Sequence, residues 1–410
     1  MNLYIHKLDC LIDGAKQHDT VHAEPYCLAR AIQLVPACPI ENIYIIGSHP
    51  TRIINKGKHA TLIDINVHEF LSETYSSVLT KPTCQDMWIL WGGNADLIQW
   101  TEPHVGKAIV NLCNMWAKTS AMKFALCTDM RFQFKEKFVT PHGTIYLKQD
   151  PSFGKVVELT QCMNLQHTIF DAHEFLPLFT MPFYNNAQFA QFIQIGQKKD
   201  DTMDIRETDL VFPTRDWNML SHSKLAKFID YHVHSKLSTA IPGIHKHVAY
   251  LFADMTSKQI ETSKSCLRFD VPVTFEGLSG YMSHSIATIA IGDAEYEAHQ
   301  LLPNRIGEGL KARIFVMIDE AIDPEHKLFS GGKIADTLAN ATYVKSYSDV
   351  LQRLKFFKAN TDKYATYVYA QLQHIINEYQ LGQWFMNKAL PHAIRHLDTH
   401  NCDCCDRGLL

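Results

Sequence analysis

The amino-acid sequence predicts an α/β protein built from two similar domains, each a doubly wound, mostly parallel sheet with helices on both faces. Three observations support this prediction. The chain has 410 residues, which is long for a single hydrophobic core. Short, wholly apolar segments alternate with amphipathic ones, and strands that are apolar on both faces are typical of parallel sheets covered by helices. The alternation stops at one polar segment and then starts again.

The first domain is expected to span residues 1–195. The helical patterns in it are Pro25–Leu34 and Val105–Lys118, and the second of these has its apolar residues spaced to form one face. Its predicted strands are Leu3–His6, Ile43–Ile46, Met87–Trp91 and Lys123–Cys127.

The second domain is expected to span residues 209–375, after a polar linker at residues 196–208. Its predicted strands are Asp209–Phe212, His247–Phe252, Ile286–Ile291 and Arg313–Ile318, and its predicted helices are Ser221–Val233, Leu301–Leu310 and Ser346–Lys358. The run from Tyr364 to Leu397 reads as helical, with breaks at Gly382 and Pro391. Two such domains suggest a cleft between them, and ligands of doubly wound sheets bind at the carboxyl ends of the strands.

Composition and charge narrow the function classes. The formal net charge is −4, from 39 basic and 43 acidic side chains, which weakly opposes binding to nucleic acid, although a local basic groove counts for more than the total. The 11 cysteines are odd in number and form no regular framework, as expected for reduced thiols in the cytoplasm. No secretory signal is apparent, and no apolar run approaches the roughly 20 residues of a membrane helix.

The first segment that carries chemistry is Lys123–Phe132. Its apolar strand ends directly in Asp129, at the sheet edge where a cleft would need a base. A carboxylate is ionised at neutral pH and can accept a proton from a hydroxyl that becomes a nucleophile. On pattern alone, a turn cap or an ion pair with Arg131 is the commoner role for such a residue.

The second segment is Ile289–Gly309. A strand ends in Gly292-Asp293, a polar loop follows, and a helix then presents Arg305 and Glu308 on one face. A carboxylate in this position suits the two hydroxyls of a ribose, and an arginine suits a diphosphate. A surface ion pair is the commoner explanation for two such residues taken alone.

Together, the two segments resemble the DNA β-glucosyltransferases of T-even bacteriophages. The strand-Thr-Asp-hydrophobic-Arg element is similar to that family's base loop, which implies that Asp129 is the catalytic base. The stretch Ile289–Tyr296 is similar to the family's donor element and implies contacts to the sugar nucleotide by Gly292, Asp293 and Tyr296. The Arg-x-x-Glu spacing of Arg305 and Glu308 implies diphosphate and ribose contacts.

The resemblance is looser in the rest of the chain. It implies a GT-B fold, in which two Rossmann-like domains face each other across a cleft and a C-terminal helical segment, residues 376–410, packs back on the N-terminal domain. The loop with Gly92, Gly93 and Asn94 is similar to a Gly-Gly loop that precedes the base strand, which implies that it contacts the acceptor DNA. Glu24 corresponds to a family glutamate near the sugar of the donor. The family's glycine-rich diphosphate loop with two arginines is altered, because residues 212–218 contain no glycine and only Arg215.

The implied reaction is an inverting transfer of glucose from UDP-glucose to 5-hydroxymethylcytosine in double-stranded phage DNA, with the target base flipped out of the duplex. 5-Hydroxymethyluracil as acceptor, another sugar such as arabinose, a non-DNA acceptor and a catalytically silent DNA-binding relative remain alternatives. The enzyme would be a monomer in the host cytoplasm and would need no protein-held metal, although a divalent cation could stimulate it.

Expected DNA contacts are Arg131, Lys135 and Lys137, and also Arg52, Lys56 and Lys58 in a loop after the second strand; solvated loops are the commoner explanation for such runs. The tail around Cys402, Cys404 and Cys405 fits no standard zinc spacing.

Overall fold

The computed structural model describes most of the chain and divides it into two compact units. The described residues are 1–8, 20–72, 81–92, 101–127, 137–147, 156–164, 172–177, 208–214, 247–251, 267–270, 275–292, 294–329 and 336–397. The first unit comprises Met1–Gln161, Leu165–Asn185 and Gln380–Leu410, and the second comprises Cys162–Asn164 and Asn186–Tyr379. The C-terminal segment therefore belongs to the first unit. The expected linker at residues 196–208 lies outside the described residues except for Thr208.

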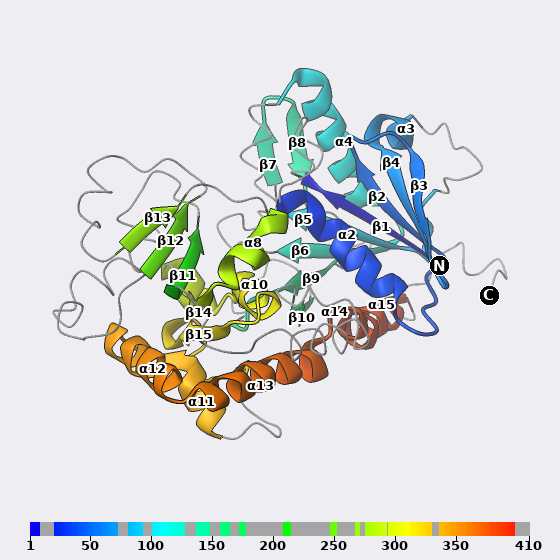
Figure 1. Cartoon of the computed structure of the whole chain (residues 1–410). Helices are drawn as coiled ribbons and strands as arrows, with labels where there is room; N and C mark the ends of the chain where they lie inside the picture. Colours follow the sequence, from blue (N-terminus) through cyan, green and yellow to red (C-terminus); the bar gives the residue numbers. More distant parts are fainter. Residues whose placement is uncertain are drawn as a thin grey trace. The chain divides into compact units, whose positions relative to one another are not determined.

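The first unit is built on an eight-stranded sheet in the order β10-β9-β6-β5-β1-β2-β4-β3 (Figure 1). Only β3 runs antiparallel to its neighbour; the other pairs are parallel. The strands are β1 (Asn2–Lys7), β2 (Asn42–Gly47), β3 (Arg52–Lys56), β4 (Thr61–Asn66), β5 (Met87–Gly92), β6 (Met122–Cys127), β9 (Val156–Thr160) and β10 (Ala172–Phe175).

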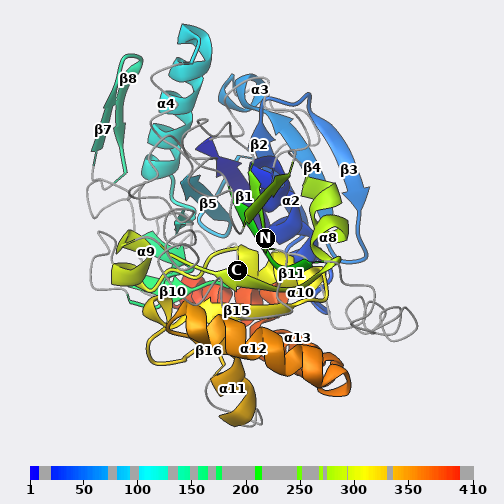
Figure 2. The same ribbon diagram turned by 60° about the vertical axis from the view of Figure 1, so that its left-hand side comes forward.

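Two apolar layers cover the two faces of this sheet. Alternate residues of a strand point to opposite faces, so Leu3 and Ile5 enter one core cluster while Tyr4 enters the other. The first cluster includes residues of α2 (Thr20–Gln33) and the second includes residues of α3 (Val67–Leu71) and α4 (Pro103–Lys118). A small hairpin, β7 (Lys137–Thr140) and β8 (Gly143–Tyr146), lies beside α4 (Figures 1 and 2).

The C-terminal segment completes the first of these layers. It consists of α14 (Leu381–Trp384), a π-helical turn (Phe385–Ala389) and α15 (Leu390–Leu397). Leu381, Phe385 and Leu390 are buried in the same cluster as Leu28 and Ile32 of α2. The predicted packing of the C-terminal helix on the first domain is confirmed.

The second unit is built on a six-stranded parallel sheet in the order β13-β12-β11-β14-β15-β16. The strands are β11 (Thr208–Thr214), β12 (His247–Leu251), β13 (Leu267–Asp270), β14 (Ser285–Ala290), β15 (Phe315–Asp319) and β16 (Tyr343–Val344). The helices are α8 (Phe275–Met282), α9 (Ala294–His299), α10 (Arg305–Lys311), α11 (Asp336–Thr342), α12 (Tyr347–Ala359) and α13 (Thr361–Tyr379).

Several predicted elements need correction. Arg52 and Lys56 lie in the edge strand β3, not in a loop, and Arg52 pairs with Asp64 of β4 at 3.3 Å. The helix predicted at Leu301–Leu310 begins only at Arg305, and the strand predicted from Arg313 begins at Phe315, because Arg313 has a left-handed φ of 56°. The predicted helix Ser221–Val233 lies outside the described residues.

The predicted helix breaks at Gly382 and Pro391 are also wrong. The break falls at Gln380, between α13 and α14, and the helical path continues through both residues. Gly382 is needed for packing, since a Cβ there would lie 2.3 Å from the carbonyl oxygen of Ala31. Pro391 has no N–H to donate, and the wider π-helical turn just before it lets the helix pass without a break.

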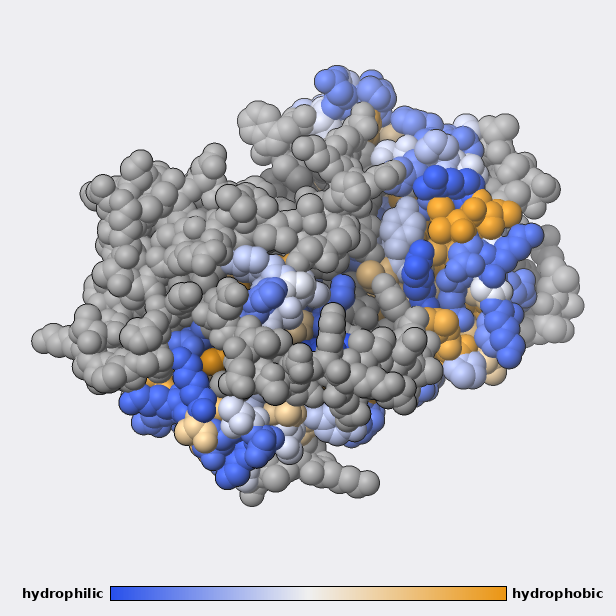
Figure 3. Space-filling view, in the orientation of Figure 1, coloured by the Kyte–Doolittle hydropathy of each residue, from blue (hydrophilic) through white to orange (hydrophobic). Residues whose placement is uncertain are grey.

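On the face shown in Figure 3, the described residues are mostly hydrophilic, with some apolar residues among them. Among the described residues, no helix combines the length and the apolar character required to cross a membrane.

Candidate active site

Each sheet has a point where its strand order reverses, and these points mark the candidate binding regions. In the first sheet β1 lies between β2 and β5, and in the second β11 lies between β12 and β14. The chain thus leaves the first strand of each sheet toward one side and later returns on the other. In open parallel sheets ligands bind at the carboxyl ends of the strands beside such a reversal.

In the first unit, strands β1, β5 and β6 end together at the carboxyl edge of the sheet. Lys7 is opposite Trp91, and Gly92 is opposite Cys127, so the three strands end at nearly the same level. Asp129 follows the end of β6 by two positions in the sequence. Asp129, Arg131, Lys135, Gly93 and Asn94 all lie outside the described residues, so their expected roles remain predictions.

Beside the reversal in the first sheet, Lys7 and Glu24 form a buried ion pair. Lys7 is the last residue of β1, and Glu24 belongs to α2, the next described helix. The Lys7 Nζ lies 2.6 Å from the Glu24 Oε2, and the two side chains are 3% and 10% exposed. The same Nζ is 5.3 Å from the centre of the Trp91 ring. Glu24 was expected near the sugar; Lys7 was missed, although a lysine that ends an apolar strand is itself an unusual signal.

In the second unit, helix α10 places Arg305 at the carboxyl edge of the sheet. β14 and β15 are parallel neighbours, so the helix between them runs back and its first residue lies where β14 ends. Gly309 allows close packing of this helix on the sheet. A Cβ at Gly309 would lie 2.6 Å from the Cγ2 of Thr288 and 2.7 Å from the Cγ2 of Val316.

The Arg305 guanidinium stacks over the side chain of a residue in β11. Its central carbon lies 4.1 Å from the centre of the Phe212 ring, a favourable cation–π distance. Burial lowers the pKa of Arg305 to about 10, and the charge interactions with Glu308 and Tyr296 oppose this shift. Arg305 therefore stays protonated at neutral pH. Sequence patterns could not reveal Phe212, which resembles any other apolar strand residue.

Gly292 packs against Tyr296, and Tyr296 lies close enough to Arg305 to interact with its charge. A Cβ at Gly292 would lie only 2.5 Å from both the Cγ2 of Ile322 and the Cβ of Tyr296, so a larger residue does not fit without movement. Tyr296 is 7% exposed. The structure thus brings together four of the predicted donor residues: Gly292, Tyr296, Arg305 and Glu308. Asp293 and Arg215 lie outside the described residues.

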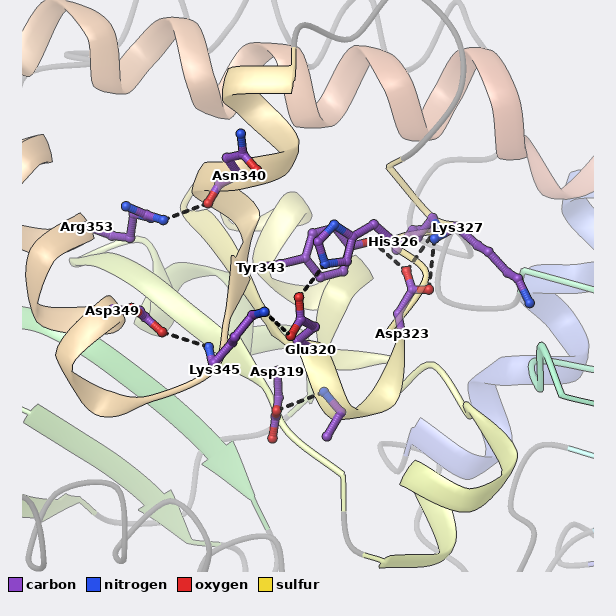
Figure 4. A network of polar contacts seen from close by, with 12 residues as sticks. Asp319, Glu320, Asp323, His326, Lys327, Asn340, Tyr343, Lys345, Asp349 and Arg353 are labelled. Carbon is purple, nitrogen blue, oxygen red and sulfur yellow. Dashed lines mark hydrogen bonds and ion pairs between the residues drawn. The ribbon is translucent and has the colours of Figure 1, made fainter.

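A network of polar contacts fixes the segment that follows β15 (Figure 4). Ile322 belongs to the same segment. Asp323 is fully buried and accepts hydrogen bonds from the Tyr343 hydroxyl at 2.5 Å and from the backbone N–H groups of Lys327 and Leu328. Burial and the Asp323 carboxylate raise the pKa of Tyr343 far above its usual value. The His326 ring stacks on Tyr343, with ring centres 3.9 Å apart. This network fixes the segment whose Ile322 packs against Gly292.

Glu320 is the outer member of the network. It accepts hydrogen bonds from His326 at 2.8 Å and pairs with Lys345 at 3.0 Å. Burial opposes ionisation, but the contacts with Lys345 and His326 lower the pKa of Glu320 overall. Among the described residues, no three His, Cys, Asp or Glu side chains form a metal-ligand group.

No family model and no curated protein matches this sequence. Solved structures of the β-glucosyltransferase of T4 phage do match, over 96% of this chain and 99% of theirs. The complex with UDP-glucose gives a TM-score of 0.58 at 14% identity. The DNA-modifying enzyme with and without uridine diphosphoglucose gives 0.56 at 15%, and the complex with UDP and Mn²⁺ gives 0.55 at 15%. The chain therefore has the GT-B fold.

Proposed function

We propose that this chain is an inverting glycosyltransferase that moves a sugar, most simply glucose, from a UDP-sugar to the hydroxymethyl group of 5-hydroxymethylcytosine in double-stranded DNA. One observation supports this most strongly. The two segments expected to carry the chemistry follow strands β6 and β14, which lie close to the reversal of strand order in each sheet. That is where doubly wound domains bind their ligands.

The donor would bind at the second unit. Arg305 can donate two parallel hydrogen bonds to the diphosphate, and its ring contact with Phe212 holds the guanidinium plane. Glu308, one helical turn later, would accept hydrogen bonds from the ribose hydroxyls. Gly292 and Tyr296, together with Asp293 and Arg215, would line the rest of the donor site, and Glu24 of the first unit would contact the sugar.

The transfer would be a single displacement. Asp129 takes the proton of the acceptor hydroxyl as its oxygen forms a bond to C1 of the sugar. The bond between C1 and the diphosphate oxygen breaks on the opposite face, so the anomeric centre inverts and UDP leaves. Arg305 meets the negative charge that develops on the diphosphate, and such pre-placed charge is commonly the largest single contribution to catalysis.

The charge on the leaving diphosphate would be met by a protein cation, so we propose that transfer requires no protein-held metal. A divalent cation could still speed the release of UDP. Under this proposal, EDTA slows multiple turnovers at most and leaves the first turnover unchanged. A loss of the first turnover in rapid-quench measurements would contradict it.

The acceptor DNA would contact the hairpin β7–β8 and the residues that precede it. Lys137 is opposite Tyr146, and Val139 is opposite Thr144. Opposite residues share a face of the ribbon, and so do residues two apart in a strand, so these four side chains lie on one face. Val139 is 81% and Tyr146 47% exposed. Asn114 of α4 holds this ribbon by bonding the Thr144 carbonyl and the Tyr146 N–H. A two-stranded ribbon of this kind can enter a DNA groove.

A GT-B transferase with a non-DNA acceptor is the second candidate, and the net charge of −4 favours it. Incubation of the protein with a panel of UDP-sugars and duplexes, followed by nucleoside mass spectrometry, separates the possibilities. The duplexes contain 5-hydroxymethylcytosine, 5-hydroxymethyluracil or unmodified cytosine. A hexose on 5-hydroxymethylcytosine supports the proposal, a pentose or modified uracil corrects its sugar or base, and no sugar on any duplex refutes the DNA acceptor.

A further inference from the structure

The buried ion pair between Lys7 and Glu24 carries a large desolvation cost in free energy. Lys7 is 3% exposed and ends a strand in which Leu3, Tyr4 and Ile5 pack in the core. Removing both charges from water costs free energy that their attraction rarely recovers, and apolar residues of similar volume often give equal or greater stability. Stability alone is therefore a poor explanation for the pair.

A second buried lysine in the same sheet shows what a structural role looks like. Lys123 of β6 is 4% exposed and donates a hydrogen bond at 3.0 Å to the carbonyl oxygen of Ala117, near the end of α4. A cation there complements the carboxyl end of a helix. Lys7 instead contacts a carboxylate, and it does so at the strand-order reversal, where a parallel sheet binds ligands.

The charge of the pair restricts the ligand class. Lys7 and Glu24 together are neutral, so they offer no net attraction to a diphosphate. A carboxylate held by an ammonium group suits neutral donors such as sugar hydroxyls. The Trp91 ring, beside Lys7, helps to fix the ammonium group.

We infer that Lys7 is a positioning residue for the sugar site: it holds the Glu24 carboxylate at the carboxyl edge of β1 so that Glu24 can accept hydrogen bonds from the hydroxyls of the transferred sugar. The inference rests on the proposed function, because it assumes a UDP-sugar donor. It adds to that proposal a residue that acts on the sugar only through another side chain.

Isothermal titration calorimetry of the full chain with UDP-glucose and with UDP tests this. Lys7→Met and Glu24→Gln should each weaken UDP-glucose binding about tenfold, the loss of roughly one hydrogen bond to a charged group, and should leave UDP binding within about twofold. The double variant should bind UDP-glucose no more weakly than either single variant, because the two residues act as a unit. Lys123→Met is the matched control and should change neither affinity.

Three results would overturn the inference. Lys7→Met could bind UDP-glucose as tightly as the wild type, could lose UDP and UDP-glucose in equal proportion, or could add its loss fully to that of Glu24→Gln. If Lys7→Met does not fold, the double variant, which removes both charges, still separates sugar binding from UDP binding. A wild type that binds neither ligand refutes the proposed function itself, whereas a wild type that binds both, with an unaffected Lys7→Met, refutes only the role of Lys7.

Discussion

At the residue scale, Arg305 is the residue that we propose binds the diphosphate of the donor. Its guanidinium is held over Phe212 and its pKa is lowered to about 10 by burial, yet it remains charged at neutral pH. A desolvated cation in a fixed plane loses little further freedom when it binds a diphosphate.

Arg305→Lys keeps the charge but removes the planar pair of donors. We expect UDP to bind about tenfold to a hundredfold more weakly to this variant, and more weakly still to Arg305→Ala. Calorimetry with UDP measures both. Equal UDP affinity in wild type and Arg305→Lys would show that Arg305 does not grip the diphosphate.

Glu308 should discriminate between sugars of the nucleotide. If it binds the ribose hydroxyls, the wild type prefers UDP to 2′-deoxy-UDP by roughly tenfold, and Glu308→Ala loses that preference. The test is the ratio of the two affinities, not either affinity alone. A preference that survives in Glu308→Ala would assign the ribose to another residue.

His6 makes the stability of the first unit sensitive to acid. Burial lowers the pKa of His6 to about 3, and its Nδ1 accepts a hydrogen bond from the Trp88 indole at 2.9 Å. Between pH 6.5 and pH 3, His6 binds a proton in the unfolded chain but not in the folded chain. Stability is therefore lost as the pH falls through this window, by up to about 1.4 kcal/mol per pH unit for one proton.

Denaturant titrations at pH 7.5 and pH 5 measure this effect. His6→Asn should be less stable than the wild type at pH 7.5 but should lose less stability on acidification. The pKa of His374 is also lowered by burial, so some pH dependence should remain. An unchanged difference between the two pH values would rule out His6 as a source.

At the scale of elements, two amide side chains hydrogen-bond to the backbone of a strand, as a neighbouring strand would. Gln371 of α13 donates to the Val316 carbonyl at 2.7 Å and accepts from the Val316 N–H at 3.0 Å. Asn114 of α4 does the same for two residues of β8. Both satisfy backbone groups at strand edges that would otherwise lack partners.

Gln371→Leu should be the more damaging of the two substitutions. Gln371 is fully buried, so its loss leaves two backbone groups without water or partner and should cost about 2–4 kcal/mol. Asn114→Leu acts at a partly buried site and should cost about 1 kcal/mol. Melting temperatures compare them directly, and equal effects would argue against the strand-edge role of Gln371.

Elements that are buried on both faces could be predicted from sequence, and elements defined by their neighbours could not. β1, β2, β5 and β6 are mostly apolar and buried, and the sequence predicts the ends of each strand to within two residues. β3 is mostly exposed and charged, so nothing in its own sequence separates it from a loop. Pro391 predicts a break, but the helix continues through it after the π-helical turn, whose Phe385 is buried in the same apolar cluster as Leu28 of α2.

At the scale of the whole molecule, the chain crosses to the second unit and returns. Residues after Tyr379 belong to the first unit, where Phe385 is fully buried against Phe124, with ring centres 6.4 Å apart. The stability of the first unit therefore depends on the last part of the sequence.

Two alanine substitutions in this segment form a matched pair. Phe385→Ala should destabilise the first unit by about 3–5 kcal/mol, the usual cost of a large core cavity. Ile394→Ala, at a side chain that is 43% exposed, should be close to neutral. Chemical denaturation measures both, and similar costs would contradict the assigned packing.

The candidate site divides in the same way. The placement of Arg305 and Glu308 on one helix could be predicted because their spacing is visible in the sequence. The contact of Lys7 with Glu24 and that of Phe212 with Arg305 could not, because these residues meet only after distant segments pack together.

The most direct test of the central claim is sugar transfer by the wild type and by Asp129→Ala, measured with UDP-glucose and a 5-hydroxymethylcytosine duplex by nucleoside mass spectrometry. The wild type should form glucosylated 5-hydroxymethylcytosine. Asp129→Ala should bind UDP-glucose normally but transfer about 10²–10⁴ times more slowly, the usual contribution of a general base. Transfer by Asp129→Ala at the wild-type rate would show that Asp129 is not the catalytic base.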